Sequence, residues 1–207
     1  MFTKFLDTSR IEVWKRLVEF KDVGILAGGT ALSMQINHRI SYDFDVFTDK
    51  PIDDRFLLKL KKIFWEYEVE PMVDTGDELT VMLSGNVKLS FVYFPFVKLE
   101  KAVETDSLDL FSINDLLANK AYALGRRKTW RDYVDIYWAL KNNLIDLKKL
   151  ITITEQKFDG VFSAKLFLEQ LVYFSDVAEI EVDWTGEKVE NEDIKKYLFD
   201  EVTNYLK

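Results

Sequence analysis

Asp43 and Asp45 are the residues whose types and spacing point most directly to chemistry. They stand in the segment Ser41 to Phe47, whose alternation of side chains predicts a β-strand. Because strand side chains alternate between two faces, both carboxylates should point the same way. Two like charges this close repel each other unless a cation joins them. A divalent metal ion is one solution, and a solvated strand edge is the ordinary alternative.

The rest of the composition restricts which metal this could be. The chain of 207 residues has no cysteine and only one histidine, His38. Disulfides, thiolate nucleophiles and Cys-ligated zinc are therefore excluded, and a Ser-His-Asp triad is disfavoured. A metal held mostly by oxygen indicates Mg²⁺ or Mn²⁺.

A glycine turn stands shortly before the aspartate pair. The apolar run Val23 to Ala27 predicts a buried strand, which ends in Gly28-Gly29-Thr30, and a helix is predicted from Ala31 to His38. A strand-to-helix turn presents backbone N–H groups and the positive end of a helix, and both suit phosphate. Alone, this is an ordinary turn. Beside the carboxylate pair, it predicts a phosphate cradle next to a metal site.

Two polar residues continue this arrangement in the order Arg39-x-Ser41-x-Asp43-x-Asp45. Arg39 is a candidate for contact with a phosphate or with the aspartate strand, and Ser41 is a second candidate for phosphate. One helix and a turn separate Gly29 from Asp43, so the two predicted strands can be neighbours in one sheet.

The stretch AGGTALSMQINHRISYDFDVF, residues 27–47, resembles the first motif of the AbiEii/AbiGii-type toxins of the DNA polymerase β-like nucleotidyltransferase superfamily. A Gly-Gly turn followed by D-x-D is similar to the superfamily signature, and G-G-T-A-L … H-R-x-S-x-D-F-D to its narrower form in this branch. The resemblance implies an NTP substrate, a magnesium ion and transfer of a nucleoside monophosphate. It also implies a toxin of a toxin–antitoxin or phage-defence pair, with a cognate antitoxin and with tRNA as one acceptor.

A later segment extends the resemblance. Lys120 lies on a predicted helix, and Trp130-Arg131-Asp132-Tyr133-Val134-Asp135-Ile136-Tyr137 opens the next one. This resembles the family's later motif, which implies that Lys120, Asp132 and also Asp135 belong to the active site. A lysine near a triphosphate would offset its charge. From spacing alone, the same carboxylates are equally well a charge cluster at a helix N-terminus.

One position departs from the superfamily pattern. The strand predicted over Val87 to Phe94 carries Ser90 where the resemblance implies a third aspartate facing Asp43 and Asp45. Serine is a poor metal ligand and a poor base. Either Asp132 or Asp135 takes over the missing role, or the protein binds nucleotide without transferring it. Lys88, on the same face as Ser90, is a candidate for contact with phosphate.

The elements around these residues predict an α/β fold, a small mixed sheet with flanking helices followed by a helical lobe. We expect an α/β lobe over 1–111 and a helical lobe over 112–207 that completes the active site. Apolar periodicity and turn residues predict helices at 9–20, 53–65, about 112–126, 130–141, 145–157, 160–175 and 191–206, and further strands at 69–73, 79–83 and 87–94. Residues 176–190 are predicted as a loop or short hairpin.

Charge and hydropathy bear on partners and location. The formal net charge is −8, so a global basic footprint for nucleic acid is absent. The densest basic cluster comprises Arg126, Arg127, Lys128 and Arg131, and it could contact an RNA acceptor or a nucleotide. The N-terminal segment lacks the apolar core of a signal peptide, and no apolar run is long enough to cross a membrane. We therefore expect a cytoplasmic protein.

The sequence predicts a nucleotidyltransferase with Asp43, Asp45, Lys120 and Asp132 as catalytic residues. The phosphates would lie against Gly28, Gly29, Thr30, Arg39 and Ser41. Two alternatives remain. One is a catalytically inactive module that binds a nucleotide or a partner, and the other is a nucleotidyltransferase that acts on a small molecule such as an antibiotic.

Overall fold

The computed structural model describes all residues from 1 to 207, and they form two compact units. The first unit comprises residues 1–96 and 101–112, and the second comprises residues 97–100 and 113–207. None of the helices combines the length and the apolar character needed to cross a membrane.

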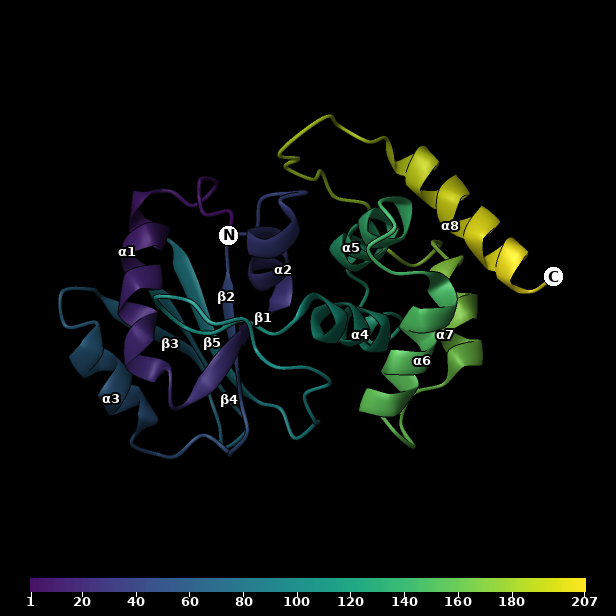
Figure 1. Ribbon diagram of the computed structural model, residues 1–207. Helices are drawn as coiled ribbons and strands as arrows, with labels where there is room; N and C mark the ends of the chain where they lie inside the picture. The colour runs from purple at the N-terminus through teal and green to yellow at the C-terminus, as the bar shows by residue number, and fades with distance from the viewer. The chain divides into compact units, whose positions relative to one another are not determined.

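The first unit is built on a five-stranded mixed sheet with the order β1-β2-β5-β4-β3 (Figure 1). β2 and β5 are parallel, and all other neighbouring pairs are antiparallel. This confirms the predicted fold class. The strands are β1 (Gly24–Ala27), β2 (Phe44–Thr48), β3 (Val69–Asp74), β4 (Glu78–Leu83) and β5 (Val87–Tyr93).

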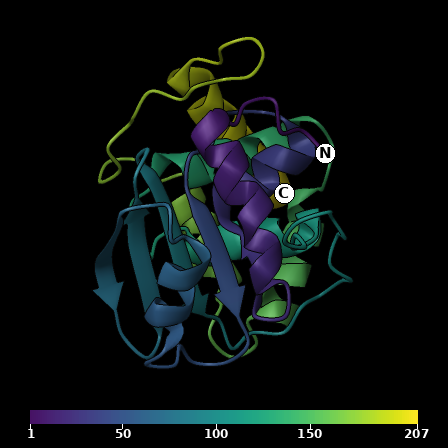
Figure 2. The same cartoon turned by 90° about the vertical axis from the view of Figure 1, so that its left-hand side faces the viewer.

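An aromatic cluster joins one face of this sheet to the helices that cover it. Those helices are α1 (Thr8–Arg16), the 3-10 turn η1 (Leu17–Phe20) and α3 (Phe56–Ile63), and Figure 2 shows α1 and α3 in front of the strands. The ring of Phe20 lies 4.8 Å from that of Phe91 on β5 and 5.8 Å from that of Phe56. Because strand side chains alternate, residues next to Phe91 in sequence point to the opposite face of the sheet.

Helix α2 (Gly28–Ile36) follows β1 without an intervening loop and contacts β1 and β2. Its apolar residues Ala31, Leu32 and Met34 are fully buried. The helix ends at Asn37, which adopts the left-handed conformation with φ 49°, a common way to stop a helix. The α2 glycines therefore lie at the junction of strand and helix, as predicted.

The second unit consists of five helices with an apolar core of its own. Asp146 and Ser163 cap the third and fourth of these helices by accepting hydrogen bonds from Lys149 N and Leu166 N. Residues 176–190 form a loop, in agreement with the first of the two predicted forms. The helices are α4 (Ile113–Ala123), α5 (Trp130–Lys141), α6 (Leu147–Lys157), α7 (Ala164–Leu171) and α8 (Asn191–Tyr205).

A buried ion pair ties α4 to α6 and anchors the segment before α4. Lys157 donates to the carboxylate of Asp115, and both side chains are fully buried. Asp115 also accepts hydrogen bonds from Leu99 N at 2.9 Å and from Glu100 N at 3.1 Å. Burial lowers the pKa of Lys157, and the bond to Asp115 works against that shift. Residues 97–100 belong to the second unit because their backbone is bound there.

Candidate active site

Asp45 lies in a row of residues that crosses four strands. In the register of the sheet, Ala27 is paired with Asp45 on the next strand, Asp45 with Ser90, and Ser90 with Thr80. Residues paired directly across a sheet point to the same face. The row therefore lies on the face opposite the aromatic cluster, and Ser90 occupies the place beside Asp45 that was expected for a third carboxylate.

Asp43 does not lie on the strand, and the prediction of a strand from Ser41 was wrong in its first half. β2 begins at Phe44, the residue that follows Asp43. On one side, β1 ends at Ala27, opposite Asp45, where the chain turns into α2, and on the other side the pairing with β5 begins only at Phe44, opposite Leu89. Instead, the hydroxyl of Thr30 donates to the backbone carbonyl of Asp43. Thr30 thus fixes the segment that carries the first carboxylate.

The two glycines permit a close approach between the start of α2 and the polar side chains beside it. Gly28 has φ +68°, and a Cβ placed on it would lie 2.2 Å from Oδ2 of Asp45. A Cβ on Gly29 would lie 2.7 Å from Nη2 of Arg39 and 2.8 Å from Oγ of Ser41. The backbone at the start of α2 therefore lies against three side chains that the sequence predicted for the site, those of Asp45, Arg39 and Ser41. The structure brings them together around one turn.

Two cations accompany this cluster. The side chain of Arg39 is buried, at 2% exposure, and its Nη1 donates to the carbonyl of Ile40 at 3.1 Å. Lys88 points to the same face as Ser90, and its Nζ lies 3.7 Å from Oδ2 of Asp43. Both partners of that pair are exposed by about two fifths, so solvent screens their attraction. Lys88 is therefore available to a phosphate group.

The second group of predicted residues is fully buried within the second unit. Nζ of Lys120 lies 2.8 Å from Oδ1 of Asp132 and 2.8 Å from Oδ2 of Asp135, and neither carboxylate is exposed. Arg127 holds Asp132 with two parallel bonds, from Nε at 2.8 Å and from Nη2 at 2.9 Å. Two cations thus balance two carboxylates, Lys120 from the interior and Arg127, whose side chain is 55% exposed, from the solvent side.

Comparison with known proteins identifies the family to which this chain belongs. A family model described as "Nucleotidyl transferase AbiEii toxin, Type IV TA system" matches residues 13–202. The chain belongs to the AbiEii nucleotidyltransferase toxin family. This confirms the resemblance inferred from the Gly28 to Asp45 motif. An antitoxin belongs with such a toxin.

One curated relative is similar to this chain in sequence, and two solved structures are similar to it in fold. The AbiEii chain is 30% identical over 194 residues to "Uncharacterized protein aq_aa25" of Aquifex aeolicus (strain VF5), an alignment that covers 87% of each protein. It shares its fold with a candidate nucleotidyltransferase from H. pylori, with a TM-score of 0.60, 17% identity and coverage of 96% and 95% of the two chains. JHP933 from Helicobacter pylori gives a TM-score of 0.54 at 16% identity, with 97% and 98% covered.

Asp43 and Asp45 are the residues of this AbiEii protein whose chemistry could hold a magnesium ion. Asp43 and Asp45 are both partly exposed, and oxygen is the ligand that Mg²⁺ prefers. No three Asp, Glu, His or Cys side chains gather into a metal cage anywhere in the chain. Mg²⁺ commonly takes only one or two carboxylates and completes its coordination with phosphate oxygens and water. The pair suits that mode of binding.

Sequence reasoning missed three residues of these clusters in this AbiEii chain. Arg127 was grouped only with a basic run, and its fork on Asp132 was not foreseen because a loop of unknown shape separates the two residues. Thr80 and Glu78 received no role at all. The hydroxyl oxygens of Thr80 and Ser90 are 2.9 Å apart, and Thr80 Oγ1 lies 2.6 Å from Oε1 of Glu78.

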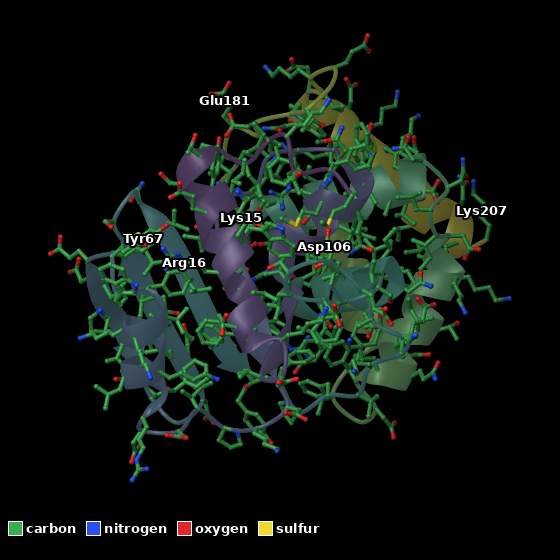
Figure 3. The ribbon with its side chains drawn as sticks, turned by 60° about the vertical axis from the view of Figure 1, so that its left-hand side comes forward. Lys15, Arg16, Tyr67, Asp106, Glu181 and Lys207 are labelled. Carbon is green, nitrogen blue, oxygen red and sulfur yellow. The ribbon has the colours of Figure 1, made fainter.

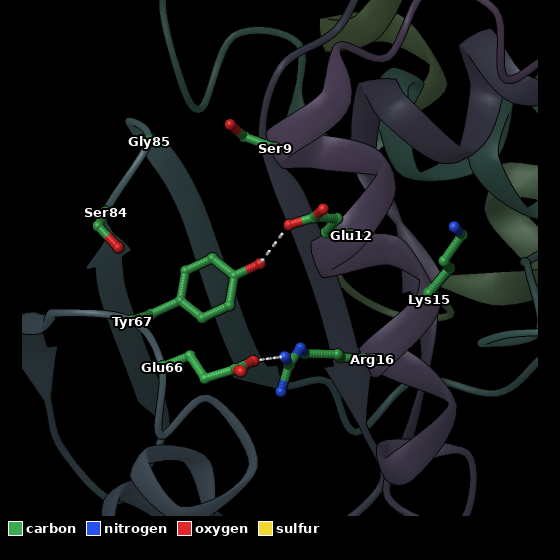
Figure 4. Close-up of a pocket in the computed structure, with 8 residues that line it drawn as sticks. All are labelled: Ser9, Glu12, Lys15, Arg16, Glu66, Tyr67, Ser84 and Gly85. Carbon is green, nitrogen blue, oxygen red and sulfur yellow. Dashed lines mark hydrogen bonds and ion pairs between the residues drawn. The ribbon is translucent and has the colours of Figure 1, made fainter.

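A groove of about 730 Å³ lies elsewhere on the first unit of the AbiEii protein, between α1 and the residues that follow α3 (Figure 4). Tyr67 donates to Glu12 at 3.4 Å, and Arg16 pairs with Glu66. Arg16 also lies over the ring of Tyr67 at 5.5 Å, and Figure 3 shows these two residues close together. None of the predicted site residues lines this groove. Its lining is Ser9, Glu12, Lys15, Arg16, Glu66, Tyr67, Ser84 and Gly85.

Proposed function

We propose that this protein transfers a nucleoside monophosphate from an NTP to an acceptor hydroxyl and releases pyrophosphate. The observation that carries the proposal is the contact of Gly28 with Asp45, where a Cβ would stand 2.2 Å from the carboxylate. Such a contact brings the backbone at the start of α2 close to a carboxylate oxygen. A nucleotide presents the matching chemistry, because its phosphates require both hydrogen-bond donors and a cation.

The phosphates would lie against the start of α2. The backbone N–H groups of the first turn have no partner within the helix, and the helix dipole favours negative charge there. Because the Thr30 hydroxyl is engaged with Asp43, Thr30 would contribute its backbone N–H. Arg39 and Ser41 stand beside Gly29, and Lys88 stands beside Asp43, so both sides of the turn carry groups that suit phosphate.

Asp43 and Asp45 would hold magnesium, or manganese in its place. When bound, the ion would neutralise phosphate charge and orient the reacting groups. Asp45 would be the better-fixed ligand, since it belongs to β2 and packs on Gly28, whereas Asp43 lies in the segment before the strand. This difference implies that Asp45 sets the position of the ion and that Asp43 adjusts to it.

Lys120 and Asp132 would support the same reaction. The family motif that Lys120 matches would give it the role of offsetting the charge of the leaving pyrophosphate. Asp132 and Asp135 hold its ammonium group in a defined position, which lowers the entropy lost when it acts. Asp132 therefore assists by positioning Lys120, and Arg127 in turn holds Asp132.

An RNA hydroxyl, with tRNA as the leading case, is the proposed acceptor. Two observations support it. The chain belongs to a toxin family, and the basic cluster identified from the sequence includes residues that remain accessible, such as Lys128 with a side chain 66% exposed. NTPs and tRNA occur together in the cytoplasm, so the reaction would take place there. A cognate antitoxin would oppose it.

The direct test incubates the protein with each α-labelled NTP, magnesium and total RNA. Wild type is compared with Asp45→Asn and with Asp49→Asn, an exposed aspartate four residues away that serves as the matched control. We expect label on RNA with wild type and the control and none with Asp45→Asn. Transfer that survives Asp45→Asn would overturn the site. Binding of NTP without transfer would establish the inactive module instead, and label on an aminoglycoside but not on RNA would establish a small-molecule enzyme.

A further inference from the structure

Three side chains form a continuous chain on the face of the sheet that carries Asp45. The hydroxyls of Ser90 on β5 and Thr80 on β4 lie 2.9 Å apart, and Thr80 lies 2.6 Å from the carboxylate of Glu78. Ser90 and Thr80 are buried, with 4% and 3% exposure, whereas Glu78 is half-exposed. This series of hydrogen-bonded side chains therefore leads from a buried hydroxyl to a carboxylate that is partly exposed to solvent.

Elementary chemistry shows which group donates and which accepts in these two hydrogen bonds. An ionised carboxylate accepts hydrogen bonds and cannot donate them, so Thr80 donates to Glu78. The distance of 2.6 Å is typical of a hydroxyl bound to a carboxylate. Because Thr80 has only one proton, its oxygen accepts from Ser90. Ser90 Oγ then keeps a lone pair for a further donor on its other side.

That other side is where Asp45 lies. Ser90 pairs with Asp45 across the parallel strands β5 and β2, and adjacent strands are about 4.8 Å apart. An acceptor hydroxyl that attacks the α-phosphate of a nucleotide bound at Asp45 would therefore come within reach of Ser90 Oγ. Ser90 is too weak a base to take that proton alone, but Glu78 lies two hydrogen bonds further along.

The alternative base is less suitable. Both oxygens of Asp132 are engaged by cations, with Lys120 and Arg127 at 2.8–2.9 Å. Its oxygens are therefore already occupied by these donors, and the side chain is fully buried. Asp132 is thus suited to positioning a lysine, and not to accepting the proton of the attacking hydroxyl.

We propose that Glu78 is the proton acceptor of the transfer reaction and acts through Thr80 and Ser90. This inference rests on the proposed function. As the acceptor oxygen forms its bond to the α-phosphorus, its proton passes to Ser90 Oγ, the Ser90 proton passes to Thr80 Oγ1, and the Thr80 proton passes to Glu78. The bond between the α-phosphorus and the bridging oxygen breaks, and pyrophosphate leaves with those electrons. Glu78 later releases its proton to solvent.

The test measures kcat and KM for NTP in Glu78→Gln, Thr80→Val and the double variant. General-base catalysis contributes about 10²–10⁴-fold, so each single variant is expected to lose about 10²-fold or more in kcat. KM for NTP should change less than about twofold, because the relay touches only the acceptor proton. The double variant should be no slower than either single one, since both interrupt the same path. Thr80→Ser, which keeps the hydroxyl, should retain most of the activity.

Asp77→Asn is the matched control, an exposed carboxylate next to Glu78 in sequence, and it should leave kcat unchanged. Thermal unfolding of every variant separates a lost relay from a lost fold. Full activity in Glu78→Gln, or losses that multiply in the double variant, would overturn the relay while the function stands. A wild-type protein that transfers nothing, tested alongside Asp45→Asn, would show that the proposed function itself had failed.

Discussion

The two charged clusters of this protein are built on opposite principles. In the first unit, Asp43 and Asp45 are partly exposed, and Nζ of Lys88 stands 3.7 Å from Oδ2 of Asp43. In the second unit, Asp132 and Asp135 have no exposure, and Lys120 lies 2.8 Å from each. The carboxylates of the first cluster are partly exposed to solvent, whereas those of the second are fully buried.

Because of this difference, we expect substitutions in the second cluster to lower stability and substitutions in the first cluster to lower activity. Removing one partner of a buried, hydrogen-bonded pair leaves a charge that the protein cannot solvate, so stability falls. A partly exposed carboxylate is solvated whether or not a ligand is present, so its loss affects chemistry and leaves the fold largely intact. The first cluster should therefore behave as a binding site and the second as a fixed support for one lysine.

The largest expected effect on stability comes from Lys120→Met. It leaves Asp132 and Asp135 buried without their shared ammonium group, and breaking a buried pair costs about 3–5 kcal/mol. Urea unfolding would measure the loss. Lys128→Met is the control, because its surface pair with Asp176 should contribute less than about 1 kcal/mol. If Lys120→Met is as stable as wild type, the second cluster is not held by its charges.

Gly28→Ala should reduce transfer about 10²-fold, because a misplaced reacting geometry costs that much even for small displacements. The new Cβ would meet Asp45 at 2.2 Å, and the backbone would keep a φ of +68° that alanine disfavours. The control is Gly76→Ala, where a Cβ meets nothing within 4 Å. Equal activity of the two variants would show that the approach of Gly28 to Asp45 has no role.

A smaller effect is expected in the pH dependence of stability, through Tyr133 on α5. Burial, with the charges of Asp176 and Asp132, raises the pKa of Tyr133 to about 12. Since the unfolded tyrosine ionises first, near its ordinary pKa of about 10, the free energy of unfolding should fall as pH rises from about 10 to 12. Allowing for solvent screening, we expect a fall of about 1–2 kcal/mol.

Tyr133→Phe should remove this part of the pH dependence, and Tyr205→Phe, at an exposed position, should retain it. Denaturant unfolding at several pH values between about 9 and 12 would show the difference. A slope that is the same in Tyr133→Phe and wild type would mean that α5 is better solvated than its burial indicates.

Arg127→Ala should have the smallest effect, about 1 kcal/mol in the free energy of unfolding, because its side chain is 55% exposed and solvent screens the pair. Arg55→Ala, at an exposed position of the first unit, is the control. The comparison with Lys120→Met is informative. A loss as large as that of Lys120→Met would place the main support of Asp132 on the solvent side of the cluster.

Most elements could be predicted because their signals are local. Apolar periodicity and turn residues marked the helices and strands to within a few residues, and Gly28-Gly29-Thr30 marked the start of α2. The strand that carries Asp45 was predicted to begin too early, because its start depends on where its pairing with β1 and β5 ends. That end is a property of strand pairing, and a single segment does not contain it.

The polar partners of the site were harder to predict for the same reason. Ser90 could be noticed as the place where a carboxylate is missing, but Thr80 and Glu78 face it only through the register of β4 against β5. The hydrogen bonds from Arg127 to Asp132 depend on the shape of the loop before α5. Contacts of this kind are fixed by tertiary structure, so residue types and spacing alone do not reveal them.

The most direct test of the contrast between the clusters measures two properties of Asp45→Asn in the same sample. We expect RNA labelling to fall at least about 10³-fold, equivalent to about 4 kcal/mol of transition-state stabilisation. The Tm should stay within about 2–4 °C of wild type, which corresponds to about 1 kcal/mol, because a partly exposed carboxylate contributes little to the fold. A Tm that falls by much more, or labelling that persists, would contradict the account of Asp43 and Asp45 as an open ligand site.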